Sequence, residues 1–500
     1  MTIHPFATLT AEEAAALIND GDFVGFSAFT ASGAAKAVPR ALSARARALH
    51  AEGNPMKIRL IAGASTGDAI DEQLAQAEAI SWRVPYQSSR TLRGQINNQQ
   101  AQFLDIHLSH LGQMLDFGFF GEIDIAIAEA VAVTRDGRIY LSTSSGATPS
   151  ILQHAKKIVV ELNEHHPQRL ADMHDIASLP KPPRRSPIPI INPLTKIGVP
   201  FVSVDPRKIV GVVNTNEPDG VSPFGDPGDA ARGIARHVSE FLVREMSTGR
   251  IPPEFLPLQA GVGNVANAVL GAIGANPDIP PFHMYTEVLQ DSQIELMKSG
   301  KLVGASTSAL TISDGLMPEI ADNMDFFTPR VVIRPTELSN NPGVVRRLGV
   351  ITMNTALEMD IYGNANSTHV AGTKLMNGIG GSGDFTRNAY LSILMAPSLA
   401  KGGRISAVVP MCSHIDHSEH SVQILVTEQG LADLRGLGPI QRARKIIDNC
   451  AHPSFRDYLH DYLNSAPIGH IRHDLGRCFE LHRNLIEHGE MLPGVATSAG

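Results

Sequence analysis

Apolar and polar positions alternate along the chain in a way that predicts strands and helices in turn. In the first half, short apolar runs predict strands at residues 23–29, 58–62, 123–133, 139–141 and 157–162. Helical spacing of the apolar residues predicts helices over 34–48 and 100–114. Strands that alternate with helices are typical of an α/β fold with a largely parallel sheet.

The second half repeats this alternation after a loop-rich middle. Its predicted strands are at 257–262, 282–286, 331–334, 405–409 and 422–426. Three helices are predicted: one begins near Asp229, a second ends near Ile273, and a third covers 291–298. Between the halves, prolines crowd residues 179–208, which indicates an ordered crossing segment or a linker. We therefore expect two α/β domains, residues 1–225 and 226–500.

The composition is that of a soluble globular protein. Of the 500 residues, 43% are hydrophobic, and 50 acidic residues outnumber 42 basic ones. No basic stripe stands out, which argues against a nucleic-acid partner. Residues 255–277 carry no charge and are long enough for a membrane helix. Because they contain two prolines and four glycines, we interpret them as strand, turn and helix, and expect no membrane partner.

Cysteine usage and the N-terminal sequence both favour a cytoplasmic protein. The three cysteines, Cys412, Cys450 and Cys478, include no Cys-x-x-Cys pair, so we expect buried, reduced thiols. The N-terminus lacks a basic region followed by an apolar stretch, which is the pattern of a signal peptide.

A glycine motif at residues 261–266, Gly-Val-Gly-Asn-Val-Ala, follows a predicted strand and opens a predicted helix. Taken alone it matches a dinucleotide-binding fingerprint, and Glu287 lies near the distance at which that fingerprint requires an acidic residue. Tight packing of a helix against a strand explains the glycines equally well.

Glu287 lies where the strand predicted at 282–286 ends. Ligands of open α/β sheets bind at the carboxyl ends of strands, so this carboxylate is a candidate functional group. It could act as a base, a nucleophile or a ribose acceptor, or it could stabilise the N-terminus of the next helix.

Residues 377–385, Asn-Gly-Ile-Gly-Gly-Ser-Gly-Asp-Phe, place four glycines within six positions. Such a segment brings several backbone N–H groups together, which suits an anion or an oxyanion. It lacks the Gly-Lys-Ser/Thr ending of a phosphate-binding P-loop. Three histidines, His414, His417 and His420, are spaced so that one helix or strand face cannot carry them all, and we favour a polar loop over a metal site.

Together, these segments resemble the acetyl-CoA hydrolase/transferase family of class I CoA-transferases. The resemblance extends over nearly the whole chain and is carried by residues 27–39, by the motifs beginning at Gly121, Gln259, Met284 and Asn377, and by residues 413–437. It implies two α/β domains with the active site in the cleft between them, and a homodimer. It also argues against a dinucleotide at Gly261.

The resemblance assigns roles to individual residues. It makes Glu287, in Tyr-Thr-Glu, the nucleophile, and Gly381 an oxyanion donor. Asn340 corresponds to an active-site asparagine and Glu428 to a second carboxylate near the acyl pocket. The implied CoA-binding residues are Val262, Gly263, Asn264, Val265, Ala266, Asn377, Gly381 and Lys401. No metal and no tightly bound cofactor are expected, because CoA is a substrate.

The implied reaction moves CoA from succinyl-CoA to acetate through an acyl-glutamyl anhydride and a glutamyl-CoA thioester. Hydrolysis of acetyl-CoA and transfer between another pair, such as propionyl-CoA and succinate, remain open. So do two other classes, a nicotinamide dehydrogenase and a non-catalytic CoA-binding regulator. Ala28 and Ala31 replace an expected glycine and proline, which leaves acyl specificity less determined than the reaction.

Overall fold

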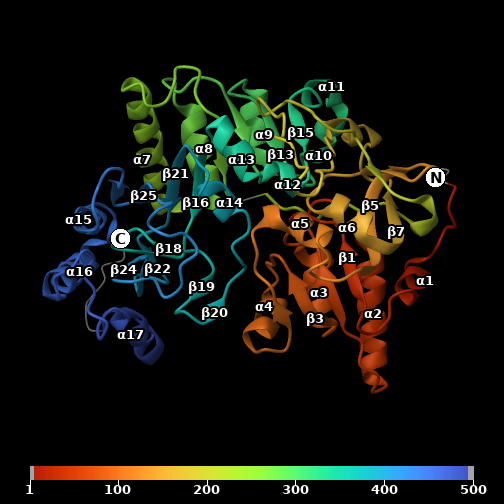
Figure 1. The fold of residues 1–500 in the computed structure, drawn as a ribbon, viewed down its shortest axis with the longest axis horizontal. Coiled ribbons are helices and arrows are strands. Elements are labelled where there is room, and N and C mark those ends of the chain that lie inside the picture. The colour runs from red at the N-terminus through yellow and green to blue at the C-terminus, as the bar shows by residue number, and fades with distance from the viewer. Residues whose placement is uncertain (1–4, 224, 494–500) are drawn as a thin grey trace.

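Two large, mostly parallel β-sheets dominate the computed structural model, which describes residues 5–223 and 225–493 (Figure 1). In the first sheet, a parallel ladder runs β4-β3-β2-β1-β5-β7-β9, and β6 and β8 add antiparallel pairs beside β5. Its strands are β1 (Phe23–Phe26), β2 (Ile58–Ile61), β3 (Ile80–Val84), β4 (Gln102–Phe103), β5 (Ile123–Val133), β6 (Arg138–Leu141), β7 (Ala155–Asn163), β8 (Val202–Ser203) and β9 (Ile209–Thr215).

The second sheet has the order β15-β13-β11-β10-β16-β21-β25-β26, parallel except for the last pair. Its strands are β10 (Leu258–Ala260), β11 (Phe282–Tyr285), β13 (Leu302–Thr307), β15 (Val331–Ile333), β16 (Ile351–Thr355), β21 (Leu391–Met395), β25 (Ile424–Thr427) and β26 (Gly430–Asp433). The predicted boundary at residue 225 falls in the segment between β9 and β10.

Helices cover the sheets because each sheet has two apolar faces. In the first half, buried side chains of α2 and α3 pack on one face and those of α5 and α6 on the other. The helices of this half are α1 (Ala11–Ala16), α2 (Ala37–Ala51), α3 (Asp71–Gln76), α4 (Arg90–Asn97), α5 (Leu111–Asp116) and α6 (Thr148–His154). Those of the second half are α7 (Gly228–Ser247), α8 (Asn264–Ala275), α9 (Asp291–Lys298), α10 (Met317–Asp322), α11 (Met324–Phe327), α12 (Thr336–Ser339), α13 (Pro342–Leu348) and α14 (Ser382–Thr386).

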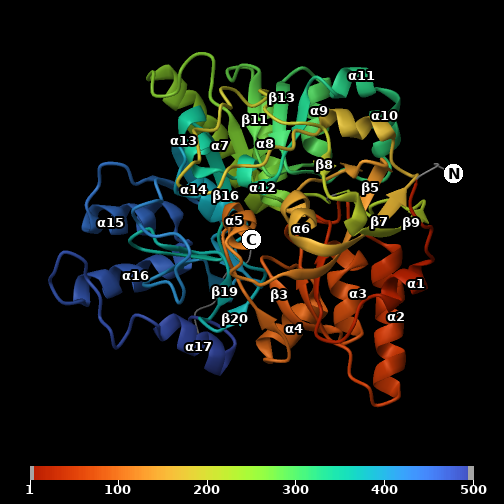
Figure 2. The same ribbon diagram turned by 45° about the vertical axis from the view of Figure 1, so that its right-hand side comes forward.

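The C-terminal region adds a further layer with an apolar core of its own. Both ribbon views place its three helices to one side of the sheets (Figure 2). They are α15 (Pro439–Cys450), α16 (Pro453–Ser465) and α17 (Glu480–His488). Short strands lie in this layer and in loops elsewhere in the second half: β12 (Val288–Leu289), β14 (Ala309–Leu310), β17 (Glu358–Asp360), β18 (Ala365–Asn366), β19 (His369–Val370), β20 (Lys374–Leu375), β22 (Leu399–Ala400), β23 (Ile405–Ser406) and β24 (Val408–Val409).

The proline-rich stretch proves to be an ordered segment that crosses from one half to the other. Ile188 and Ile190 are buried in a cluster with apolar residues of the second half. Their carbonyl groups accept hydrogen bonds from Arg347 Nη2 at 2.6 and 2.8 Å. Because prolines remove donors from this backbone, side chains of the second half supply its partners.

The α/β fold predicted from the sequence is confirmed, and 123–133 and 291–298 have the predicted bounds. The helix predicted over 100–114 is wrong. That segment contains strand β4, a 3₁₀ turn at Leu108–His110 and the short helix α5. The strand predicted at 405–409 is also interrupted, as β23 and β24, which belong to different sheets.

Contacts with the other half explain why the residues near 105 do not form the predicted helix. The Asp105 carboxylate accepts the backbone N–H of Ile379 at 2.9 Å, and Asp384 accepts two hydrogen bonds from Ser109. These tertiary hydrogen bonds hold the segment against the other half, and they outweigh the weak preference for a helix that spacing expresses.

The uncharged stretch at 255–277 contains strand β10, a glycine turn and helix α8, as predicted. Within the described residues, helices that combine the length and the apolar character needed to span a membrane are absent. All three cysteines are free and buried, as expected of small apolar side chains.

Candidate active site

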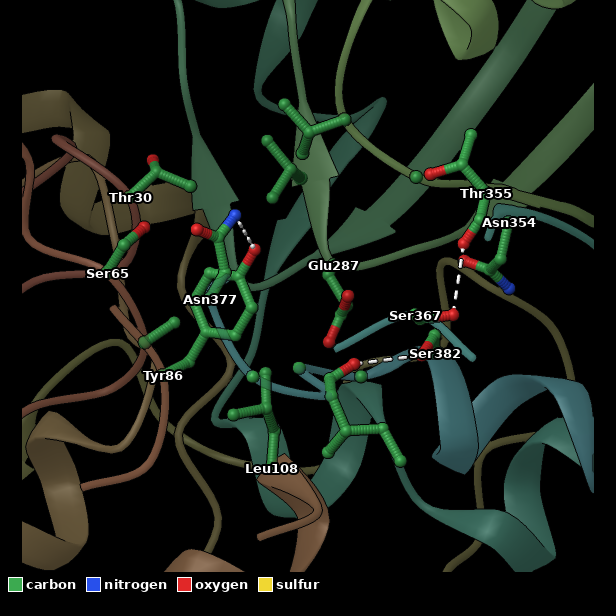
Figure 3. A pocket seen from close by; sticks show the side chains of 18 of the residues that line it. Thr30, Ser65, Tyr86, Leu108, Glu287, Asn354, Thr355, Ser367, Asn377 and Ser382 are labelled. Atoms are coloured by element: carbon green, nitrogen blue, oxygen red, sulfur yellow. Dashed lines mark hydrogen bonds between the residues drawn. The ribbon is translucent and has the colours of Figure 1, made fainter. Parts of the chain in front are cut away.

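A cavity of about 330 Å³ lies where the strands of both sheets end (Figure 3). Thr30, Ser65 and Tyr86 line it from the loops that follow β1, β2 and β3. Val262 and Glu287 line it from the loops that follow β10 and β11. The cavity therefore joins the carboxyl ends of two parallel sheets, where α/β proteins bind their ligands.

The backbone of Glu287 is fixed by its neighbours. Its carbonyl oxygen accepts the N–H groups of Ser308 and Ala309 at 2.8 and 3.1 Å. The hydroxyl of Thr307 donates to the same oxygen at 2.9 Å. These three hydrogen bonds hold the backbone of Glu287 in place, so its side chain extends from a fixed position.

The Glu287 carboxylate faces an amide and a glycine, and the described residues place no cation beside it. Asn340 Nδ2 donates a hydrogen bond to Glu287 Oε1. A Cβ added to Gly381 would lie 1.7 Å from the same oxygen, so only glycine fits there. Burial raises the pKa of Glu287 to about 7; the Asn340 hydrogen bond lowers it and the Asp384 charge raises it.

Asn340 is itself held in one orientation. It is fully buried at the end of α12, and Ser339 Oγ donates to its Oδ1 at 2.7 Å. The Ser339 hydroxyl lies 2.6 Å from that of Ser308. Because Asn340 Oδ1 accepts the Ser339 hydroxyl, the NH₂ group of the amide points the other way, towards Glu287.

The glycine segment at 377–383 connects the two halves next to Glu287. Asn377 Nδ2 donates to the Tyr86 hydroxyl at 3.1 Å, and Arg93 Nη2 donates to Asn377 Oδ1 at 2.5 Å. Gly378 and Gly380 have φ angles of 126° and 57°, in the region that favours glycine. This backbone therefore passes close to Tyr86 and Asp105 without side chains in the way.

The structure brings Glu287, Asn340 and Gly381 together and places Asn377 and Val262 on the same cavity. Val262 is 46% exposed. Gly263 precedes helix α8, and Asn264, Val265 and Ala266 form its first turn.

Two predicted site residues lie elsewhere. Lys401 and Glu428 line a second cavity of about 700 Å³, which does not include Glu287. Glu428 accepts the backbone N–H of Ser398 at 2.8 Å and the hydroxyl of the same residue. The structure thus does not bring Glu428 to the Glu287 carboxylate, as its expected place near the acyl pocket would require.

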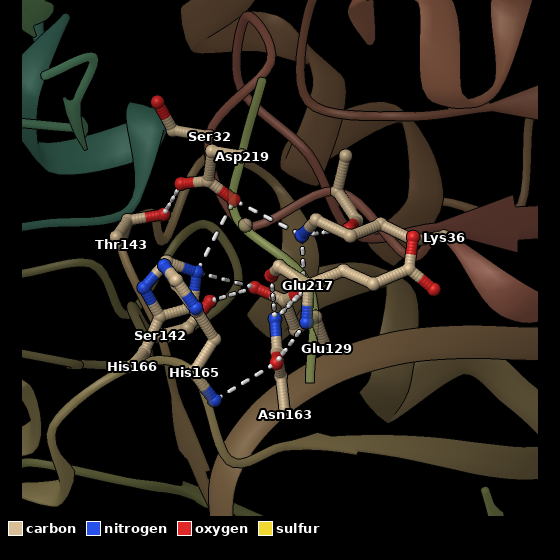
Figure 4. A network of polar contacts seen from close by, with 12 residues as sticks. Ser32, Lys36, Glu129, Ser142, Thr143, Asn163, His165, His166, Glu217 and Asp219 are labelled. Carbon is tan, nitrogen blue, oxygen red and sulfur yellow. Dashed lines mark hydrogen bonds and ion pairs between the residues drawn. The ribbon is translucent and has the colours of Figure 1, made fainter. Parts of the chain in front are cut away.

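The histidines at 414–420 lie in a loop before β25 and do not converge. His417 is buried, with Nε2 3.2 Å from Ser382 Oγ, whereas the His414 ring lies 4.2 Å from that of His369. In the described part of the chain, the group of side chains that could hold a metal is instead Glu129, His166 and Asp219. The ammonium group of Lys36 contacts both carboxylates there, so a cation is already supplied (Figure 4).

Several residues at this site were missed in the sequence. Thr30, Ser65 and Tyr86 each follow a first-half strand, so the rule that ligands bind at carboxyl ends of strands could have found them. Asp384, at the end of the glycine motif, lies in helix α14, and its local sequence carries no signal of a role at the site. Ser109 carried no signal, because its partner is 275 residues away.

Comparison with known proteins gives consistent matches over both halves. Residues 4–214 match the acetyl-CoA hydrolase/transferase N-terminal domain, and residues 317–463 match the C-terminal domain. The chain is 56% identical to a propanoyl-CoA:succinate CoA transferase of Escherichia coli, over 97% of this chain and 98% of the relative. It is 45% identical to a succinyl-CoA:acetate CoA-transferase of Clostridium kluyveri, over 97% and 90%.

A solved structure shares the fold at low identity. The 4-hydroxybutyrate CoA-transferase of Porphyromonas gingivalis aligns with a TM-score of 0.62 and 19% identity, over 92% of this chain and 97% of that one. Sequence identity over nearly the full length, with both domains matched in order, decides the classification: the chain belongs to the acetyl-CoA hydrolase/transferase family.

Proposed function

We propose that this protein is a CoA-transferase that moves CoA from succinyl-CoA to acetate, with Glu287 as the nucleophile. A Glu287 oxygen attacks the thioester carbonyl, CoA leaves as the thiolate, and a mixed anhydride forms. The thiolate then attacks the glutamyl carbonyl, releasing succinate and leaving CoA as a thioester on Glu287. Acetate reverses both steps, so acetyl-CoA forms and the carboxylate is regenerated without water.

The observation that carries this proposal is a carboxylate enclosed at the cavity wall with no cation beside it. Burial raises the pKa of Glu287 to about 7, so its ionised form is poorly stabilised and reacts readily. A carboxylate held in place only as a structural group has a cation or several donors. Among the described residues, the donor to Glu287 Oε1 is Asn340, and the missing side chain of Gly381 lets the carboxylate approach the backbone closely.

The same two neighbours suit the oxyanions of the reaction. When the glutamyl carbonyl becomes tetrahedral, the Asn340 N–H group is already directed at one of its oxygens. We assign the Gly381 amide as a second donor. A donor that is in place before the reaction is worth about 10²–10³ in rate.

The open side of the cavity is assigned to CoA. Phe29, Ala64, Leu108 and Val288 form one apolar cluster of the lining and are each less than 5% exposed, whereas Val262 is 46% exposed. The small acyl group is assigned to this apolar cluster and the long CoA chain to the exposed part of the lining. The turn at 262–266 and Asn377 are the proposed CoA contacts, and Lys401 is assigned to a CoA phosphate.

A second substrate pair, propanoyl-CoA and succinate, is favoured by one observation, the 56% identity to the Escherichia coli enzyme of that name. Initial rates with acetate and propanoate as acceptors for succinyl-CoA separate the two. A kcat/KM for acetate that exceeds the value for propanoate supports the first pair, and the reverse supports the second.

The nucleophile is tested by trapping. The protein is incubated with succinyl-CoA without an acceptor, reduced with borohydride, digested and mapped by mass spectrometry. Reduction of a glutamyl thioester to an alcohol is expected at Glu287 and should be prevented by acetate. The peptide with Glu428, another carboxylate at the end of a strand, serves as the internal control and should stay unmodified.

The same experiment identifies a hydrolase. If Glu287 stays unmodified and succinyl-CoA or acetyl-CoA is consumed equally with and without acceptor, water is the acceptor. Glu287 would then act as a general base, and the transferase proposal would be rejected.

A further inference from the structure

Asp384 is a buried carboxylate that lies one amide away from the nucleophile. It belongs to α14, and the residue is 3% exposed. Asn340 Nδ2, which donates to Glu287 Oε1, also lies 3.4 Å from Asp384 Oδ2. One NH₂ group therefore faces two carboxylates.

Asp384 is fixed from the other half of the molecule. The backbone N–H of Ser109 donates to Oδ2 at 3.0 Å, and the Ser109 hydroxyl donates to Oδ1 at 2.6 Å. Ser109 lies in the 3₁₀ turn Leu108–His110, and its neighbour Leu108 lines the cavity. All the hydrogen bonds described for the Asp384 side chain come from donors, which suits an ionised carboxylate that can only accept.

The alternative orientation of Asn340 is disfavoured by the two carboxylates. If its amide were flipped, Oδ1 would face the carboxylate oxygens of Asp384 and Glu287, and Nδ2 would face the Ser339 hydroxyl. The first arrangement brings acceptors together without a proton between them. Asp384 and Ser339 thus hold the Asn340 amide from opposite ends.

We infer that Asp384 is a positioning residue of this active site, which orients Asn340 towards Glu287 and keeps the nucleophile from ionising too easily. Ser109 holds Asp384 in place only when the two halves of the chain meet. The effect of Asp384 on Asn340 and Glu287 therefore depends on the assembled cavity. The inference deepens the proposed function and rests on it for the role of Glu287.

The charged and titratable groups around this pair support the assignment. The pKa of Asp384 is raised above its usual value by burial, although Ser109, His107 and Asn340 act to lower it. Among the groups that act on the pKa of Glu287, the charged one is Asp384, and it raises that pKa. Tyr86 also faces Glu287, and burial raises its pKa, so its hydroxyl stays neutral.

The test is the pH profile of kcat/KM for succinyl-CoA and acetate with Asp384→Asn. The substitution keeps the shape and removes the charge, so Glu287 should ionise at lower pH. The acidic limb is expected to move down by about one pH unit. Because the new amide brings N–H groups towards Asn340 and Ser109, the plateau rate should also fall, by about ten-fold.

Asp360→Asn is the matched control. Asp360 is fully buried in the same half, and burial raises its pKa to about 6, but its partners are Asn364 and backbone N–H groups outside the cavity. This variant should keep the wild-type limb and plateau. If Asp384 were purely structural, Asp384→Asn would also leave the acidic limb of the pH profile in place and would change only the melting temperature.

A second variant covers the case in which Asp384→Asn does not fold. Ser109→Ala keeps the charge and removes one donor, and its plateau rate should fall a few-fold while the limb moves by less than half as much. An unchanged plateau in this variant would overturn the inference, as would an unmoved limb in a folded Asp384→Asn.

Failure of the proposed function is distinguished by titrating Glu287 directly. Infrared difference spectra of the carboxyl band, with Glu287→Gln as the reference, report its ionisation without turnover. If the wild-type protein lacks transferase activity but its Glu287 titrates about one unit above that of Asp384→Asn, the function fails and the positioning effect stands. If both titrate alike, the inference fails whatever the reaction.

Discussion

The Glu287 site and the Lys36 cluster, defined as Lys36, Glu129, His166 and Asp219, both bury carboxyl groups, but within the described parts of the chain only the second contains a cation. Lys36 Nζ contacts Glu129 and lies 3.0 Å from Asp219. Burial raises the pKa of Asp219, but Lys36 and His166 outweigh it and hold that pKa well below its usual value. At Glu287, burial acts without such a partner and the pKa rises.

The difference separates a structural role from a reactive one. In the Lys36 cluster the charges neutralise one another, and side chains such as Ser142, Thr143 and Asn163 saturate the carboxylates (Figure 4). Asp219 belongs to the segment between the two sheets, so the cluster fastens that segment to the first sheet. The Glu287 site gives its carboxylate few hydrogen-bond donors and no cation among the described residues. A carboxylate that is stabilised so weakly is a better nucleophile.

Glu287→Gln is expected to have the largest effect, and on activity alone. Transferase turnover should fall by at least about four orders of magnitude, because the amide cannot form the anhydride. The free energy of unfolding, measured with urea, should not decrease, since no ion pair is lost. Retention of more than 1% of the turnover would contradict the assignment of the nucleophile.

Lys36→Met should have the opposite profile. It leaves Glu129 and Asp219 buried without their cation, which should cost about 3–5 kcal/mol in the free energy of unfolding. The folded fraction should keep its KM. Lys156→Met is the control: Lys156 pairs with Asp124 and Glu122 at the surface, and its loss should not be measurable by urea denaturation.

Gly381→Ala should lower turnover by about 10²–10³-fold, because the new Cβ would overlap the Glu287 carboxylate. Gly271→Ala, in helix α8, has nothing within 4 Å of the added carbon and should stabilise the protein by about 0.5–1 kcal/mol. Steady-state kinetics and thermal unfolding of the two variants separate the effects. Equal turnover in both would remove Gly381 from the site.

The pH dependence of stability is a smaller effect than the losses of turnover expected for Glu287→Gln and Gly381→Ala. The pKa of Glu287 is raised from 4.5 to about 7, so the folded state binds its proton more tightly than the unfolded one. This stability is fully present below pH 4.5 and is lost as the pH rises to about 7, a change of up to about 3 kcal/mol. Urea unfolding at pH 5 and 7.5 should show this loss in the wild type and not in Glu287→Gln.

Asp219 should behave in the reverse sense. Because its pKa is lowered, its contribution is present above its unfolded value of 3.8 and is lost as the pH falls below that value. Asp219→Asn should therefore flatten the acid side of the stability curve. An unchanged acid side would show that Lys36 does not stabilise the charged form.

The sequence by itself determined the α/β class, most strand positions and the nucleophile candidate. Strands such as 123–133 are recoverable because their apolar runs are local, and Glu287 because it directly follows a strand. The glycines near residue 381 are local signals too, since only glycine tolerates such close approach.

Only the tertiary structure decided how these pieces meet. The helix that spacing predicts over 100–114 is absent because Asp105 accepts a hydrogen bond from the other half and Ser109 donates one to it. Glu428, also a carboxylate at the end of a strand, lies in another cavity. The contrast between Lys36 and Glu287 likewise depends on partners far away in sequence. The physical reason is that burial and the charge of neighbours set the behaviour of a carboxylate, and neither is a local property of the chain.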